Sequence, residues 1–86
     1  MGKNEKLIDK VKSGKNDKNI RFNELVELTK LLGFFERIKG SHHIYYKDGI
    51  SEILNFQPDG QQAKPYQVRQ LRNVILNYGL EFKDDE

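Results

Sequence analysis

Gly40-Ser41-His42-His43-Ile44-Tyr45-Tyr46 contains both histidines and two of the four tyrosines of this 86-residue chain, between the basic residues Lys39 and Lys47. Glycine and serine favour a turn, and the β-branched and aromatic residues that follow favour a strand. This heptapeptide therefore predicts a turn at residues 40–41 and a strand over residues 42–47, with His42 where the turn ends.

The residues on either side extend this strand into a three-stranded meander over residues 34–57. The segment 34–39 precedes the turn and is predicted as the first strand. Asp48-Gly49 follows the second strand and is a strong hairpin signal, so residues 50–57 form the third strand. Pro58 ends the meander, because proline is excluded from the interior of a paired strand.

Apolar residues at helical spacing predict three helices, over residues 4–12, 23–32 and 66–78. Asn23 is a good N-cap for the second helix, and Gly33 is expected to end it as a left-handed cap. The second helix carries one apolar stripe, expected in the core, which comprises Leu25, Leu28, Leu31 and Leu32.

The elements follow the order α-α-β-β-β-α, which predicts an α+β fold. A three-stranded antiparallel sheet with helices on one face buries the apolar side of each element in two layers. Without its first helix, the order is that of a double-stranded-RNA-binding-type fold. We expect a single domain over residues 1–82 and an acidic tail over residues 83–86.

Composition argues against several kinds of site and location. The chain has no cysteine, so it has no disulfide and no zinc-thiolate site. No apolar run approaches the roughly 18 residues of a membrane span. Near the N-terminus only Leu7-Ile8 interrupts the charged residues, so no signal-peptide core is present. We therefore expect a soluble, cytoplasmic protein that needs no cofactor.

The charge is distributed unevenly between the two halves of the chain. Residues 1–47 carry eleven Lys/Arg and six Asp/Glu, a net charge of +5. Residues 48–86 carry four Lys/Arg and seven Asp/Glu, a net charge of −3. Such an asymmetry suits a polyanionic partner, although solvated helix faces produce similar patterns.

His42 is the best candidate for acid–base chemistry at neutral pH. Metal-independent cleavage of RNA requires a base that takes the proton of a ribose 2′-OH and cations that stabilise charge on the phosphate. In that interpretation His42 is the catalytic base, and the alternative is a structural or solvated histidine. The residues expected to contact RNA are Arg37, Lys39, Gly40, Ser41 and Lys47.

Strict alternation along the strand places His42 with Ile44 and Tyr46 on one face, and His43 with Tyr45 on the other. Adjacent histidines on opposite faces do not readily chelate one ion, so we expect no metal site. If Ile44 belongs to the core, His42 lies half shielded at its edge. His43 is expected to be structural.

For several other residues the sequence allows two interpretations of their role. Tyr45 and Tyr46 either stack on bases or fill the sheet. Polar residues of the last helix either bind a nucleic-acid backbone or form a solvated face. These helix residues are Tyr66, Gln67, Arg69, Gln70 and Arg72.

Gly33-Phe34, followed by Lys39-Gly40-Ser41-His42-His43-Ile44-Tyr45, resembles the signature of HicA-family toxins. These are small mRNA interferases of bacterial type II toxin–antitoxin modules. Further along, Leu54-Asn55-Phe56-Gln57-Pro58, Gly60 and Ala63-Lys64-Pro65-Tyr66-Gln67-Val68-Arg69-Gln70-Leu71 resemble the third strand and final helix of a subgroup of the family. The resemblance covers roughly residues 4–82.

The resemblance implies a double-stranded-RNA-binding-like fold, metal-independent cleavage of mRNA and neutralisation by a HicB-like antitoxin. The histidine of the family's Gly-Ser-His motif corresponds to His42. Many members also carry a histidine at the end of the third strand, where this chain has Gln57-Pro58. A glutamine cannot exchange a proton at neutral pH. Either His42 works with a cation or water as the acid, or this subgroup is slower or differently specific.

Two other classes of function remain open on the sequence. The first is a non-catalytic RNA-binding module that uses the same sheet and basic loops. The second is a protein-interaction partner with an exposed hairpin and no role on RNA.

Overall fold

The structure is a computed structural model that describes residues 3–81. The acidic tail expected over residues 83–86 lies outside the described residues, as does Phe82, which the sequence predicts to pack back on the domain together with Leu80. It is a small α+β domain with three α-helices and a three-stranded antiparallel sheet. The helical elements are α1 (Lys3–Ser13), the 3-10 turn η1 (Asp17–Asn19), α2 (Phe22–Leu31) and α3 (Pro65–Tyr78). The strands are β1 (Phe35–Lys39), β2 (His42–Lys47), β3 (Ile50–Phe56), β4 (Pro58–Asp59) and β5 (Gln62–Ala63).

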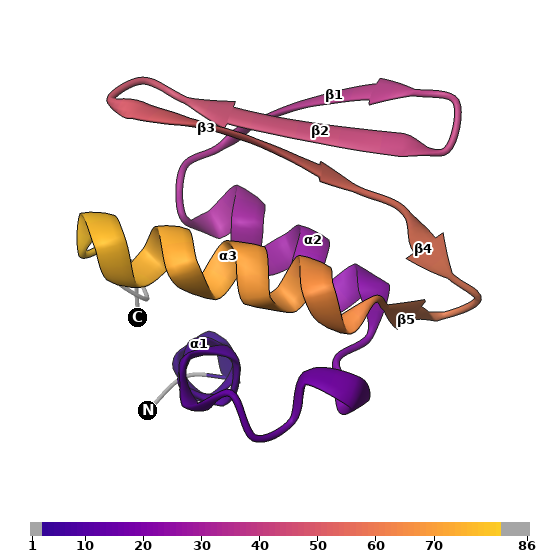
Figure 1. The fold of residues 1–86 in the computed structure, drawn as a ribbon, viewed down its shortest axis with the longest axis vertical. Coiled ribbons are helices and arrows are strands. Elements are labelled where there is room, and N and C mark those ends of the chain that lie inside the picture. The colour runs from indigo at the N-terminus through magenta and orange to yellow at the C-terminus, as the bar shows by residue number, and fades with distance from the viewer. Residues whose placement is uncertain (1–2, 82–86) are drawn as a thin grey trace.

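The sheet has the order β1-β2-β3 and lies over the helices, which all occupy one side of it (Figure 1). α3 contacts both β3 and α1, so it lies between the sheet and the first helix. α1 also contacts α2. The predicted α+β class and the meander with helices on one face are therefore confirmed.

The register of the sheet decides which face is buried. Tyr45 lies opposite Leu54, and His43 lies opposite Phe56. Leu54 and Phe56 face the helices and are almost completely buried, so antiparallel pairing buries Tyr45 with them. Because side chains alternate, Ile44 must point away from the helices. The possibility that Ile44 belongs to the core is wrong, and His42 is exposed rather than half shielded.

The second helix starts one residue earlier than predicted. Arg21, not Asn23, occupies the N-cap position, and its backbone N–H donates to the Glu24 carboxylate at 2.9 Å. At the other end Gly33 adopts φ +96°. Its N–H donates to the carbonyl of Lys30, so the expected left-handed glycine does end the helix.

The leucine stripe of α2 is narrower than predicted. Leu31 is 42% exposed, while Leu25, Leu28 and Leu32 are buried. At about 100° per residue, Leu31 falls roughly 60° outside the arc that these three leucines span. Thr29 falls about 40° beyond the other edge of that arc, between Leu25 and the buried Phe22. It is buried, and its hydroxyl donates to the Leu25 carbonyl at 2.7 Å.

A small hairpin, β4–β5, follows the meander and was not predicted. Pro58 pairs with Ala63 as the first residue of a two-residue strand, a position that tolerates the missing N–H. The Ala63 N–H donates to the Ile20 carbonyl, and the Phe22 N–H donates to the Gln61 carbonyl, each at 2.9 Å. The hairpin therefore fastens the chain ahead of α3 to the start of α2.

Candidate functional site

One face of the three-stranded sheet is turned away from the helices and is called here the outer face. Strand alternation, followed as far as the register shift between β2 and β3, places nine side chains on it, and none of the nine is acidic. Beyond the shift, the Ser51 hydroxyl contacts Tyr78 of α3 instead. They are Phe35, Arg37 and Lys39 from β1, His42, Ile44 and Tyr46 from β2, and Ile53, Asn55 and Gln57 from β3 and the residue after it.

His42 lies at the end of the outer face beside the Gly40-Ser41 turn. It pairs with Lys39 of β1 and its ring contacts two side chains of the third strand region. Gln57 Nε2 lies 2.9 Å from each ring nitrogen, and Asn55 Oδ1 lies 3.2 Å from Nδ1. The register of β2 and β3 brings these side chains together. Ile44 pairs with Asn55, so Gln57, two residues further along, lies opposite His42.

These contacts favour one tautomer of the neutral His42 ring. The Asn55 Oδ1 atom can only accept a hydrogen bond, so its contact is satisfied when Nδ1 carries the proton. The Gln57 amide nitrogen lies 2.9 Å from both ring nitrogens and does not by itself select a tautomer. Nε2 then has the free lone pair, which accepts from the Gln57 amide. This leaves Nε2 as the ring atom able to take a proton from a substrate.

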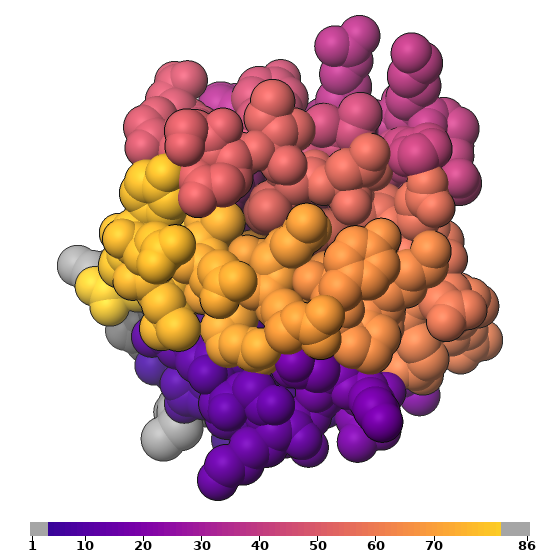
Figure 2. All heavy atoms as spheres, viewed as in Figure 1, coloured from indigo at the N-terminus to yellow at the C-terminus, as the bar shows by residue number. Residues whose placement is uncertain are grey.

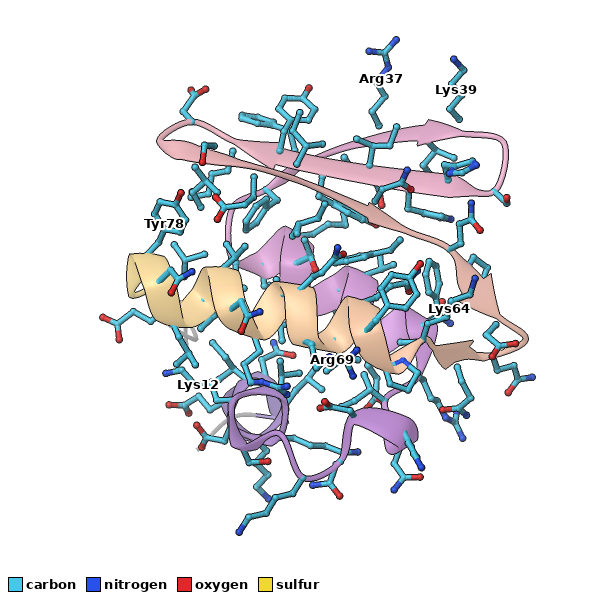
Figure 3. The ribbon with its side chains drawn as sticks, viewed as in Figure 1. Lys12, Arg37, Lys39, Lys64, Arg69 and Tyr78 are labelled. Atoms are coloured by element: carbon cyan, nitrogen blue, oxygen red, sulfur yellow. The ribbon has the colours of Figure 1, made fainter. Side chains whose placement is uncertain are left out.

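Arg37 and Lys39 are the cations of the outer face. Both side chains extend from β1 away from the helices (Figure 3). In the space-filling view, side chains from the β1 region stand out from the sheet on the side opposite the helices (Figure 2). Both are exposed, and neither forms an ion pair with any residue in the range 3–81. They are therefore available to an anionic ligand beside His42.

The turn next to His42 requires glycine for its backbone conformation. Gly40 adopts φ +61°, a region that L side chains rarely occupy, although open space surrounds the position of a Cβ. Ser41 is exposed beside it. The structure thus brings together five of the six predicted site residues, namely Arg37, Lys39, Gly40, Ser41 and His42.

Lys47 is not part of this group, contrary to the expectation based on sequence proximity. It shares the inner face with Tyr45, at the far end of β2, roughly 16 Å of strand from His42. It is half-buried, and its Nζ atom would lie 2.6 Å from a Cβ on Gly33. Its ammonium packs against the end of α2 rather than beside the imidazole.

His43 lies on the inner face and has structural contacts. Its ring packs edge-on against Phe22, with centroids 5.0 Å apart, and Nδ1 lies 3.9 Å from the Glu36 carboxylate. The two histidines therefore point to opposite faces, as alternation predicts. Within residues 3–81, no group of three or more His, Cys, Asp or Glu side chains is arranged to hold a metal ion.

The two tyrosines of β2 have different environments. Tyr45 is completely buried, and its hydroxyl donates to Glu36 at 2.7 Å. Burial, and secondly the Glu36 carboxylate, raise the pKa of Tyr45 far above its usual value. Tyr46 is 45% exposed on the outer face. Tyr45 therefore fills the core, and only Tyr46 is available to a ligand.

The polar residues of α3 fall into two groups, those held inside the domain and those exposed to solvent. Gln67 is completely buried, and Arg72 is held by Asp17 and the Val11 carbonyl. Neither belongs to a solvated face. The remaining three, Tyr66, Arg69 and Gln70, are exposed on the helical side of the molecule.

Sequence reasoning missed Asn55 and Phe35 as members of the outer face and gave Gln57 only a secondary role. The alternation of Leu54 and Phe56 with polar residues was the signal that could have identified Asn55 and Gln57 as exposed. Phe35 gave no such signal, because it follows another phenylalanine and either could have been the buried one.

Comparison of the chain with protein-family models, with curated proteins and with solved structures gives no match. Among the helices of the described residues, none has the length and apolar character needed to cross a membrane.

Proposed function

We propose that this protein is a metal-independent endoribonuclease that cleaves mRNA, with His42 as the general base. What carries the proposal is the position of His42, which is exposed on a sheet face whose nine side chains include no acid. Beside it lie the cations Arg37 and Lys39, which form no ion pair with any residue from 3 to 81. The succession of α2, the meander β1-β2-β3 and α3, with the β4–β5 hairpin before α3, and the Gly-Ser-His turn support a HicA-like toxin with a double-stranded-RNA-binding-like fold. Such a toxin would act in the cytoplasm and be neutralised by a HicB-like antitoxin.

The reaction starts when His42 Nε2 takes the proton of a ribose 2′-OH. The 2′-oxygen attacks the adjacent phosphorus, the bond from phosphorus to the 5′-oxygen breaks, and a 2′,3′-cyclic phosphate forms. A water molecule at the exposed face protonates the departing 5′-oxygen, and the hydroxide that remains takes the proton from His42 Nε2, which restores the neutral imidazole. Asn55 holds the reactive tautomer, and Gln57 exchanges its contact with Nε2 for one with a phosphate oxygen.

Charge on the phosphate rises as the 2′-oxygen attacks, and fixed cations lower the energy of that state. Lys39 pairs directly with His42 across the strands, and Arg37 lies two residues further along β1. The planar guanidinium suits bidentate contact with phosphate oxygens. The Gly40-Ser41 turn lets backbone amides approach the same phosphate.

The experiment compares wild type with His42→Ala in induced cultures and in cleavage of labelled mRNA by purified protein. We expect growth arrest and mRNA loss only with wild type, and a fall in cleavage rate of at least about 100-fold, typical for loss of a general base. RNA affinity should remain within a few-fold of wild type. His43→Gln is the matched control, because that imidazole lies on the inner face.

Equal cleavage by His42→Ala would contradict the proposal. Soluble wild-type protein that binds RNA without cutting it would instead identify a non-catalytic RNA-binding module. Growth arrest by both proteins with intact mRNA would favour a protein partner as the target of the hairpin. Metal chelation during the cleavage assay should leave the rate unchanged.

A further inference from the structure

The outer face has two ends of different character. The end beside the Gly40-Ser41 turn carries His42, Lys39 and the side-chain amides of Asn55 and Gln57. The end beside the Asp48-Gly49 turn is apolar. It carries Phe35, Tyr46 and Ile53, which are 57%, 45% and 68% exposed.

Phe35 and Tyr46 form a cross-strand pair, here called the aromatic shelf. They are register partners in β1 and β2, their ring centroids lie 5.5 Å apart, and the ring planes are inclined by 31°. The helices cover the opposite face of the sheet, so the shelf does not contribute to the core (Figure 1). Two large aromatic rings thus remain in solvent on the face that carries the candidate catalytic group.

Charge identifies the kind of occupant that suits this face. Arg37 lies between the shelf and the His42 end, two residues along β1 from Phe35 and two from Lys39. The nine residues of the outer face include these two cations and no acid. A ligand with anionic groups along one line and flat apolar groups beside it matches this arrangement, and single-stranded RNA has both.

We propose that the aromatic shelf is a base-stacking subsite, and that the substrate is single-stranded RNA lying along β1 and β2. An unpaired base stacks on Phe35 and Tyr46, phosphates contact Arg37 and Lys39, and the reacting ribose reaches His42. The inference rests on the proposed ribonuclease function and adds the substrate class and a second contact site. Tyr46 lies four positions along β2 from His42, a distance of about 13 Å, so the stacked base is not the one at the cleaved bond.

The stacking contact also selects against double-stranded RNA. In a duplex the bases stack on one another inside the helix, and their faces are not accessible to a flat protein ring. An unpaired base offers its π-face regardless of sequence, so the shelf gives affinity with little sequence preference.

The test measures binding by fluorescence anisotropy with a short 2′-O-methyl RNA strand, whose blocked 2′ positions prevent cleavage. The variants are Tyr46→Ala and Phe35→Ala, with Tyr46→Phe as the rescue. Tyr66→Ala is the matched control, since Tyr66 is 46% exposed on α3, nearly the same as Tyr46. Cleavage of the unmodified strand is followed in parallel.

We expect Tyr46→Ala and Phe35→Ala each to weaken binding by roughly 5- to 100-fold, the range for loss of one stacked base. Tyr46→Phe and Tyr66→Ala should bind as wild type does. An abasic site moved along the strand should weaken wild-type binding at one position, and the same site should have no further effect on Tyr46→Ala. The duplex form of the strand should bind more weakly than the single strand.

Three results would overturn the proposal. One is unchanged binding by both shelf variants while the unmodified RNA is still cut, which leaves the ribonuclease function intact. Another is equal affinity for duplex and single strand. A third is a wild-type dimer in sedimentation that Tyr46→Ala converts to a monomer, which would identify a second copy of the chain as the occupant. No binding and no cleavage of RNA by wild type would instead reject the ribonuclease function itself.

Discussion

Tyr45 and Tyr46 are adjacent in the chain, yet one phenol is enclosed and the other is in solvent. Tyr45 lies between the sheet and the helices, with its ring 5.5 Å from that of Phe56. Its hydroxyl has a carboxylate acceptor, Glu36, which also lies 3.7 Å from the Lys30 ammonium. A buried phenol needs such a partner, because an unsatisfied hydroxyl would cost free energy of desolvation.

The raised pKa of Tyr45 predicts how stability depends on alkaline pH. In the unfolded chain a tyrosine ionises near pH 10, whereas the folded state holds Tyr45 neutral. Its contribution to stability is therefore fully present below about pH 10 and is lost progressively as the pH rises above that value. Urea unfolding across this range should show wild-type stability falling more steeply than that of Tyr45→Phe.

Tyr46→Phe is the control for this measurement, since Tyr46 is exposed on the outer face. It should follow the wild-type curve. At neutral pH Tyr45→Phe should be less stable than wild type by about 1 kcal/mol, because Glu36 loses a hydrogen-bond donor. Parallel curves for wild type and Tyr45→Phe above pH 10 would contradict the assignment.

The sequence predicts which chemistry a residue can perform better than it predicts which side chains surround that residue. His42 was identified because imidazole is the base available at neutral pH and because it follows a Gly-Ser turn. The partners of His42 could not be predicted, because Asn55 and Gln57 lie 13 and 15 positions away in the chain. Their approach depends on the β2–β3 register, which long-range packing of Leu54 and Phe56 sets.

At the scale of elements, α3 connects the two sides of the domain. It contacts β3 on one side and α1 on the other, and Arg72 reaches the α1 side. The Arg72 guanidinium lies 2.9 Å from Asp17 of η1 and 3.2 Å from the Val11 carbonyl near the end of α1. One side chain thus fastens the first helix and the following turn to the last helix.

Removing this contact should destabilise the domain without altering the outer face. Arg72→Met retains much of the apolar length but leaves the Asp17 carboxylate without its partner, and both side chains are only 15% exposed. We expect a loss of about 1–3 kcal/mol in the free energy of unfolding. Urea unfolding checks this, with Arg69→Met on the exposed side of α3 as the matched control.

RNA binding and cleavage by Arg72→Met should remain at the wild-type level at temperatures where the protein is folded. A change of less than about 0.5 kcal/mol, the range of an ordinary surface substitution, would show that the ion pair contributes nothing to stability.

Elements with local signals lie close to their predicted ranges. α3 ends at Tyr78, its C-cap Gly79 adopts φ +61°, and the Leu80 N–H donates to the Ile75 carbonyl at 2.9 Å. The Gly40-Ser41 and Asp48-Gly49 turns lie where turn chemistry places them. The β4–β5 hairpin was missed because its two-residue strands have no periodicity of their own. Its formation depends on hydrogen bonds to the chain before α2, which no local pattern reveals.

At the scale of the whole molecule, the positive charge of residues 1–47 is not gathered on one surface. Arg37 and Lys39 extend from the sheet, whereas the lysines of α1 lie beyond α3 on the opposite side (Figures 1 and 3). The net charge counted along the sequence therefore combines two separate cationic regions. Either could attract a polyanion, but only the sheet region adjoins His42.

The salt dependence of RNA binding distinguishes the two regions. Each phosphate contact on a single strand contributes about 0.7 to the slope of log K against log salt concentration, because bound counterions are released. If RNA lies on the outer face, the double substitution Arg37→Gln/Lys39→Gln should reduce the slope by about 1.4. Anisotropy titrations with the uncleavable strand across a series of KCl concentrations measure it.

Lys6→Gln/Lys12→Gln is the matched control, because it removes the same charge from exposed positions of α1. If the outer face alone binds RNA, this double variant should keep the wild-type slope, since lysines beyond the helical layer lie farther from the phosphates than the screening length of about 10 Å. The reverse pattern, a lower slope only for the α1 variant, would place the RNA on the helical side. It would separate binding from His42 and thereby contradict both the ribonuclease proposal and the stacking subsite. Equal effects of both variants would require one strand to contact both regions, and a longer RNA should then bind more tightly than a short one.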